Sequence, residues 1–235
     1  DAPHSHAAAN LAVRLVREGR AEALMKGALH TDELMGEVLD KEHGLRTERR
    51  MSHVFSLDVP AYSKPLLITD AAINIYPDLE AKRDIIQNAI DLAHALGLDM
   101  PKVAILSAVE TIYPRIASTV EAGALCKMAD RGQIIGGILD GPLAFDNAVS
   151  KAAAEAKGIK SQVAGEADIL VAPDLEAGNM IAKQLIYLAG AESAGIVLGA
   201  RVPIMLTSRA DGAPARLASA ALALLYIRRK LEGGL

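Results

Sequence analysis

Short runs of apolar residues alternate with longer segments of helical periodicity along the chain. Residues 66–70, 103–106 and 196–198 are short, almost continuously apolar runs, as expected of buried strands. Residues 79–96, between the first two runs, carry apolar side chains at helical spacing, namely Ile85, Ile86, Ala89, Ile90, Ala93 and Leu96. Strands that alternate with helices are typical of βα units on a mostly parallel sheet. The pattern therefore predicts an α/β fold with a mostly parallel sheet flanked by helices.

The rest of the chain continues this alternation. Further strands are expected at residues 23–25, 51–57, 132–139 and 168–172, with a turn at Gly141-Pro142, and further helices at 6–19, 33–39, 144–156, 179–188 and 215–230. Thr31 or Asp32 is the expected cap of the 33–39 helix, and Asn179 of the 179–188 helix. No flexible linker divides the sequence. We therefore expect two lobes joined by crossing strands, 1–64 with 203–235 and 65–202.

Composition limits the function classes. A net charge of −4 lacks the basic footprint of a protein that binds duplex nucleic acid. Aromatic residues make up only 3% of the chain, so few side chains could stack on the bases of a single strand. A single cysteine, Cys126, excludes an internal disulfide and is interpreted as a buried core residue. No apolar stretch reaches the length of about 18 residues that a membrane span needs, and no signal peptide is visible. The expected location is the cytoplasm, away from membranes.

Polar residues follow several of the expected strands directly. Ser208, Arg209 and Asp211 come after the apolar run 196–205. Residues 27–31 follow the 23–25 strand, and backbone N–H groups there suit an anion. Comparable polar ends lie at 70–74 and 174–179. Ligands of α/β sheets bind outside the carboxyl ends of the strands, although each turn alone is equally consistent with an ordinary helix cap.

Two common kinds of site are disfavoured by residue spacing. His4 and His6 lack the third and fourth ligands of a metal site, so no metal is expected. The glycines, including Gly136-Gly137 and Gly199, do not have the spacing of a dinucleotide-binding fingerprint, and no P-loop is present. This counts against a nicotinamide enzyme and against a nucleoside triphosphatase.

Six segments taken together resemble the phosphate acetyltransferases and phosphate butyryltransferases. They stand in the family's order at residues 3–9, 27–31, 69–74, 139–146, 173–179 and 208–211. The resemblance covers essentially the whole chain, and is nearest to the butyryl-type branch and to the form fused behind an enoyl-CoA hydratase domain. Relatives carry further βα units ahead of residue 3, so we interpret the chain as lacking the family's N-terminal segment.

The resemblance implies an activity and an architecture. An acyl group passes reversibly between coenzyme A and inorganic phosphate, with acyl phosphate as the other product and coenzyme A as a substrate. No tightly bound cofactor is implied. The two α/β lobes are similar to those of isocitrate and isopropylmalate dehydrogenases, with the site in the cleft between them. Family members are commonly homodimers, and a fused or associated hydratase domain is a further expected partner.

The resemblance also implies roles for the residues after the last strand. Arg209 would hold phosphate oxygens bidentately and stabilise the developing oxyanion. Ser208 would donate a hydrogen bond to the thiol or thiolate of coenzyme A. Asp211 is the nearest candidate for the general base. The acetyltransferase branch places its acidic residue several positions further on, where this chain has only residues 212–215, Gly-Ala-Pro-Ala.

Further positions are assigned to substrate binding. Lys26, His30 and Thr31 match family positions near the phosphate end of the cleft, and Asn179 lies in another of the matching segments. Arginines of the first lobe hold phosphate in the family. Arg46, Arg49 and Arg50 are the candidates, of which Arg50 is assigned to substrate binding, and at least two of the three are interpreted as solvated charges.

Two other functions stay open at this point. A non-catalytic module could bind coenzyme A or an acyl phosphate and regulate or tether a fused hydratase, as the missing carboxylate suggests. A dehydrogenase of the related fold is the third possibility, disfavoured by the glycine spacing.

Overall fold

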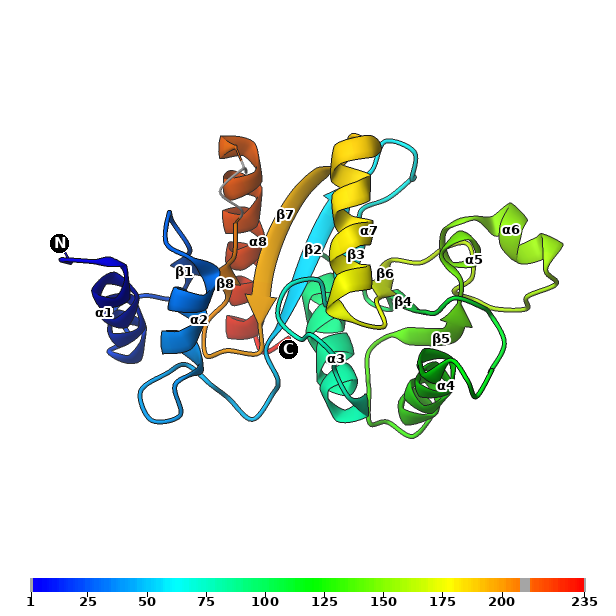
Figure 1. Cartoon of the computed structure of the whole chain (residues 1–235), viewed down its shortest axis with the longest axis horizontal. Helices are drawn as coiled ribbons and strands as arrows, with labels where there is room; N and C mark the ends of the chain where they lie inside the picture. Colours follow the sequence, from blue (N-terminus) through cyan, green and yellow to red (C-terminus); the bar gives the residue numbers. More distant parts are fainter. Residues whose placement is uncertain (1, 208–211, 235) are drawn as a thin grey trace. The chain divides into compact units, whose positions relative to one another are not determined.

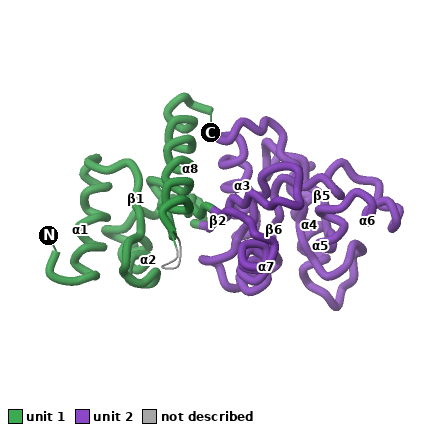
Figure 2. The backbone as a smooth tube through the Cα atoms, turned by 90° about the horizontal axis from the view of Figure 1, so that it is seen from above, with its two compact units in different colours: residues 1–51, 194–235 green, residues 52–193 purple. Residues whose placement is uncertain are grey.

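The computed structural model describes residues 2–207 and 212–234 (Figure 1). The chain divides into two compact units, unit 1 with residues 1–51 and 194–235, and unit 2 with residues 52–193 (Figure 2). These limits differ from the expected ones after residues 64 and 202. Residues 52–64 lie in unit 2, where β2 (Ser52–Asp58) pairs antiparallel with β3 (Leu66–Thr69), and residues 194–202 lie in unit 1, where Val197 pairs with Ile204.

Unit 2 is built on five strands. Their order is β2, β3, β6 (Ile169–Val171), β4 (Lys102–Leu106) and β5 (Ile138–Leu143). All neighbours except β2 and β3 run parallel. The carboxyl ends of β3, β6, β4 and β5 therefore meet at one edge of the sheet. This mixed, mostly parallel sheet confirms the predicted fold class.

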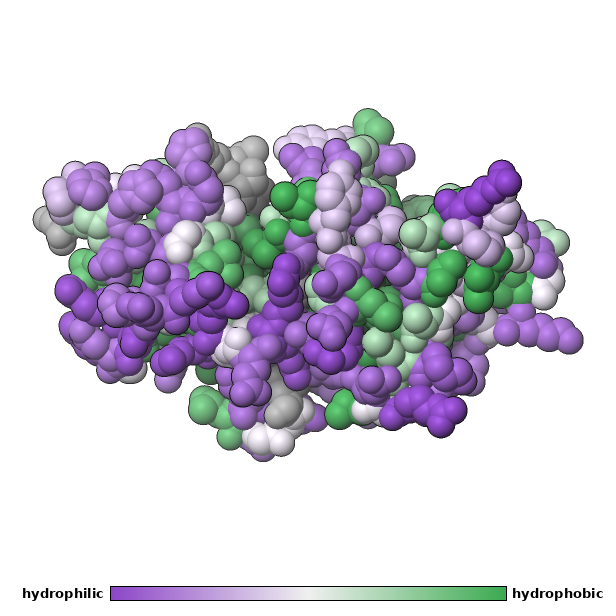
Figure 3. All heavy atoms as spheres, turned by 60° about the horizontal axis from the view of Figure 1, so that its bottom comes forward, coloured by the Kyte–Doolittle hydropathy of each residue, from purple (hydrophilic) through white to green (hydrophobic). Residues whose placement is uncertain are grey.

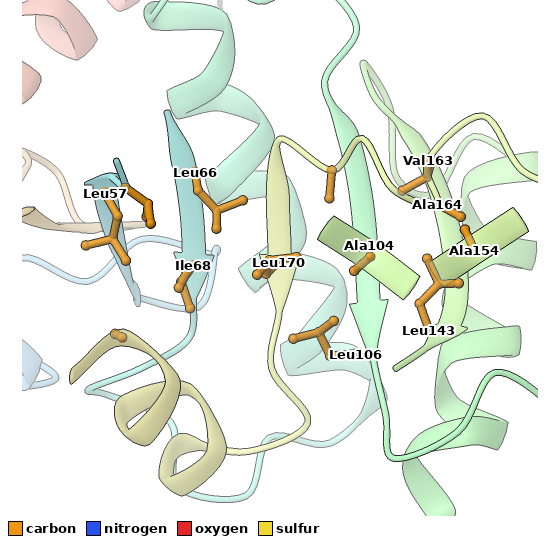
Figure 4. Close-up of a cluster of buried hydrophobic side chains, with 14 of the residues drawn as sticks. Leu57, Leu66, Ile68, Ala104, Leu106, Leu143, Ala154, Val163, Ala164 and Leu170 are labelled. Atoms are coloured by element: carbon orange, nitrogen blue, oxygen red, sulfur yellow. The ribbon is translucent and has the colours of Figure 1, made fainter. Parts of the chain in front are cut away.

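Helices cover both faces of the unit 2 sheet. The helices are α3 (Leu79–Ala95), α4 (Ala117–Asp130), α5 (Phe145–Val149), α6 (Lys151–Ala156) and α7 (Leu175–Leu188). Figure 4 shows Leu66, Ile68 and Leu170 in the cluster shared with α5, α6 and α7. Because strand side chains alternate, the intervening buried Leu67 and Ile169 face the opposite side, where α3 packs on the strands.

Unit 1 contains the two shortest strands of the described chain. Its elements are α1 (Ser5–Arg17), β1 (Leu24–Met25), α2 (Thr31–Leu39), β8 (Ile204–Met205), α8 (Ala213–Leu231) and, from residue 194 on, β7 (Glu192–Leu198). The strand order is β1, β8, β7, with β1 parallel to β8. Leu24 lies opposite Ile204 and Met25 opposite Met205, so β1 and β8 end side by side.

Several expected elements were wrong in detail. The strand expected at 132–139 begins only at Ile138. In the turn before it, Gly136 O accepts a hydrogen bond from His94 Nε2 at 2.7 Å. Gly141-Pro142 lies inside β5 and not in a turn. The helix expected at 144–156 is two helices, because Ser150 has extended backbone and its side chain caps α6.

Two expected helix caps were also wrong. α7 begins at Leu175, where the Asp174 carboxylate accepts the Ala177 N–H at 2.8 Å, and Asn179 lies within the helix. α2 is preceded by His30, and Thr31 is already helical. Both helices start earlier than apolar periodicity alone indicated.

The surface is mixed in character. Figure 3 shows a face on which hydrophilic residues predominate and hydrophobic ones form separate patches. Within residues 2–207 and 212–234, no helix combines the length and apolar character needed to cross a bilayer.

Candidate functional site

Two buried polar residues, Lys26 and Thr207, follow the ends of β1 and β8 in unit 1. The Lys26 N–H donates to Met205 O at 3.0 Å and so extends the β1–β8 pairing by one residue. Beyond it, Thr207 Oγ1 donates to Lys26 O at 3.2 Å. Both residues are buried, at 5% and 4% exposure. Thr207 directly precedes the predicted Ser208, Arg209 and Asp211, which lie outside the described residues.

Residues 26–31, here called the Lys26 loop, connect β1 to α2. The Lys26 ammonium donates to Leu29 O at 3.3 Å and to Gly27 O at 3.4 Å, so it is bound by carbonyl groups of its own loop. A buried ammonium needs such acceptors, because loss of hydration is costly. His30 is exposed and Thr31 half-buried at the first turn of α2. A cation beside the backbone N–H groups of a helix start suits an anionic ligand.

Glu33 joins the Lys26 loop to the start of α1. Its carboxylate accepts the Ser5 hydroxyl at 2.6 Å and the His30 N–H at 2.8 Å, and lies 3.8 Å from His6 Nε2. The hydrogen bond from Ser5, followed by that from His30, lowers the pKa of the Glu33 carboxyl. Sequence reasoning missed Glu33. The signal was its position three residues after the cap residue His30, as in a capping box.

A second polar cluster lies in unit 2, after β3. The Asp70 carboxylate accepts the N–H groups of Ala72, Ile73 and Asn74 at 2.9–3.1 Å, and Asn74 Nδ2 at 2.6 Å. These bonds shape residues 70–74 into a compact loop. Asp70 is 3% exposed, so its carboxylate is a structural acceptor here.

Helix α7 packs directly on this loop. Asn179 Nδ2 donates to Ala71 O at 3.0 Å, across 108 residues of sequence. A Cβ at Gly178 would lie 2.4 Å from Asp70 O, so only glycine allows this approach of backbone to backbone. Asn179, predicted to bind substrate, is half-buried and braces the 70–74 loop.

The predicted binding residues are divided between the units. Lys26, His30, Thr31 and Arg50 belong to unit 1, and Asn179 belongs to unit 2. Lys26, His30 and Thr31 share one loop, as expected from their spacing. Arg50 is exposed, and its carbonyl lies against Gly199, where a Cβ would come within 2.4 Å of it.

Metal ligands do not gather in the described part of the chain. Residues 2–207 and 212–234 hold no group of three or more His, Cys, Asp or Glu side chains placed to share an ion.

Cys126 is expected to be inert at neutral pH. Cys126 lies on α4 and is half-buried, short of the fully buried core position that was predicted, and its Sγ lies 3.7 Å from Gly141 O of β5. Burial, with smaller effects of Asp140 and Asp130, raises the pKa of the thiol to about 12. An ordinary thiol has a pKa of about 8.5, so Cys126 should react with iodoacetamide at pH 8 far more slowly than free cysteine. The rate should rise as the pH approaches 12. Rapid alkylation at pH 8, or loss of turnover in Cys126→Ala, would contradict this interpretation.

The described residues thus show an α/β protein in which a buried lysine lies beside the start of a helix, in the connection from β1 to α2. The family model described as "Phosphate acetyl/butaryl transferase" matches residues 4–224. The chain belongs to this family.

Two curated relatives illustrate the family. The phosphate acetyltransferase of Rhizobium meliloti is 68% identical over 98% of this chain and 73% of that protein. The phosphate butyryltransferase of Clostridium acetobutylicum is 45% identical over 97% of this chain and 76% of that protein. The chain thus spans about three quarters of either relative, and identity to this acetyltransferase is the higher of the two.

Solved structures agree on the fold. The branched-chain phosphotransacylase of Enterococcus faecalis V583 matches with a TM-score of 0.86 at 36% identity, over 94% of this chain and 79% of that one. The 4-hydroxythreonine-4-phosphate dehydrogenase of Klebsiella pneumoniae matches with a TM-score of 0.51 at 15% identity, over 94% of this chain and 70% of that one. The second likeness concerns the fold alone.

Proposed function

We propose that the protein transfers an acetyl or other short-chain acyl group between coenzyme A and inorganic phosphate. The reaction is acyl-CoA + phosphate ⇌ acyl phosphate + CoA. The observation that carries the proposal is 68% identity, over 98% of the chain, to a phosphate acetyltransferase. Coenzyme A is a substrate, and no tightly bound cofactor takes part. Nothing in the comparisons supports the non-catalytic module, and the dehydrogenase likeness is limited to the fold.

The chemistry is a direct attack of the coenzyme A thiolate on the acyl phosphate carbonyl. The new C–S bond forms as the C–O bond to phosphate breaks, and phosphate leaves with the electron pair. A base must take the thiol proton, and fixed donors must hold the charge that develops on the carbonyl oxygen. We assign Arg209 to the oxyanion and phosphate, Ser208 to the sulfur, and Asp211 to the proton. These three roles stay predictions, as does a site in a cleft between lobes.

The Lys26 loop is proposed as the phosphate-holding part of unit 1. The buried Lys26 ammonium supplies positive charge, and Thr31 and the first N–H groups of α2 supply donors. Arg50 is proposed as a further phosphate contact. Asn179 is proposed to act at the substrate from the start of α7, where it also holds residues 70–74.

The finer predictions on partners are kept as proposals. A homodimer is supported by large apolar side chains exposed on α7, with Met180 at 63%, Tyr187 at 70% and Leu188 at 82%. Light scattering with size-exclusion chromatography would test it. A fused or associated enoyl-CoA hydratase domain is proposed from the family resemblance, and a cytoplasmic location from the composition of the sequence.

The test of the function is an exchange assay. The protein is mixed with coenzyme A and with acetyl, propionyl or butyryl phosphate in turn, and thioester formation is followed by absorbance. We expect turnover with at least one acyl phosphate, and reversal when acyl-CoA and phosphate are supplied. Calorimetric binding of coenzyme A without any exchange would overturn the transferase and favour the non-catalytic module.

A further inference from the structure

The segment His4-Ser5-His6 stands out in the sequence but has no part in the reaction described above. In the structure His4 caps α1 and Ser5 begins it, and the Glu33 carboxylate joins this segment to the Lys26 loop. Glu33 Oε1 accepts the Ser5 hydroxyl at 2.6 Å, while Glu33 Oε2 accepts the His30 N–H at 2.8 Å. The Glu33 side chain thus joins the Lys26 loop to Ser5, which lies 28 residues before Glu33 in the sequence.

We propose that Glu33 is a positioning residue that fixes His30 and Thr31 for phosphate by locking the start of α2 to Ser5 of α1. This inference rests on the proposed function of the Lys26 loop. Glu33 touches no reacting atom, and it acts through the backbone of its neighbours.

The contacts on either end of the Lys26 loop support this role. At its first residue the loop is held by Thr207, whose hydroxyl donates to Lys26 O at 3.2 Å. At its last residues it is held by Glu33, through the His30 N–H. The Glu33 side chain is 16% exposed, so water competes weakly for its hydrogen bonds. Bonds to a carboxylate are also stronger than those between neutral groups.

The same helix pair offers a matched control. Glu37, one turn further along α2, accepts Asn10 Nδ2 of α1 at 2.9 Å. It joins the same two helices with the same chemistry but has no contact with the Lys26 loop among the described hydrogen bonds. A general loss of α1–α2 packing would affect Glu37→Ala and Glu33→Ala alike, whereas positioning would affect Glu33→Ala alone.

The expected result is a change in the use of phosphate substrates. Loss of a hydrogen bond to a charged group changes an equilibrium constant by about tenfold or more. Glu33→Ala should therefore raise the KM for acetyl phosphate about tenfold. The KM of Glu33→Ala for coenzyme A should stay near wild type. The KM of Glu37→Ala for acetyl phosphate should also stay near wild type. Ser5→Ala should show a smaller effect of the same kind, and Glu33→Gln, which keeps one acceptor oxygen, should lie between.

The experiment compares wild type and the four variants by steady-state kinetics, with thermal melts to establish that each is folded. An unchanged KM for acetyl phosphate in Glu33→Ala, or an equal rise in Glu37→Ala, would overturn the proposal. If wild type shows no turnover, the proposed function fails. Calorimetric titration with inorganic phosphate then decides the positioning role, and equal affinity in wild type and Glu33→Ala overturns it.

Discussion

Replacing Arg209 with alanine is expected to lower kcat/KM by about 100- to 1,000-fold, while the protein keeps its fold. The guanidinium is assigned to phosphate oxygens and to the oxyanion that forms during thiolate attack. A donor aimed at developing charge contributes more in the transition state than in the ground state, so its loss lowers kcat as well as raising KM. Steady-state kinetics with acetyl phosphate and coenzyme A measure the effect, and circular dichroism checks the fold.

Arg209→Lys separates charge from geometry. Lysine keeps the positive charge but loses the planar pair of donors that binds phosphate bidentately, so intermediate activity is expected. Arg228→Ala is the control, because Arg228 lies on the surface of α8 in an ion pair with Glu232. Normal turnover in Arg209→Ala would remove Arg209 from the mechanism.

Replacing Asp168 with alanine is expected to destabilise the protein by about 3 kcal/mol, near the lower limit for breaking one side of a buried ion pair. Asp168 is 7% exposed, and its carboxylate accepts Lys64 Nζ at 2.5 Å and the Lys102 N–H at 2.7 Å. Alanine leaves both donors without this acceptor. The lower limit applies because the Lys64 side chain is 33% exposed and regains some hydration. Urea unfolding measures the change.

Glu166 provides the comparison for Asp168. It lies two residues earlier and pairs with Lys102 and Lys151, but its side chain is 43% exposed. Exposed pairs contribute little, so Glu166→Ala should leave the urea midpoint nearly unchanged. Asp168 precedes β6, at the sheet edge away from the polar strand ends, so kcat per folded molecule should be unaffected. Equal destabilisation by the two variants would contradict the burial argument.

Local sequence patterns predict long amphipathic helices well and miss breaks within a helical segment. The helix expected at 79–96 appears as α3, Leu79–Ala95, because a long amphipathic segment carries many independent apolar positions. The break at Ser150 was missed, because 144–156 is rich in helix-favouring alanine. There Ser150 adopts extended backbone and caps the second helix with its own hydroxyl.

For the candidate site, Lys26, His30 and Thr31 were assigned from the family resemblance, and their spacing placed them in one strand-to-helix connection. Glu33 was missed because its partner Ser5 belongs to another helix. Asn179 was identified as polar and near a strand end, but its contact with Ala71 O spans 108 residues. No local pattern reports such a pairing.

The α/β class, the succession of strands and helices, and the family follow from residue order, because periodicity and short motifs are local properties of the chain. Strand order, the assignment of β2 to unit 2, and the Glu33 bridge between α1 and α2 were decided only by the folded chain. These features depend on which distant segments pack together. That choice is made by burial and hydrogen bonding summed over the whole molecule, and not by any one segment.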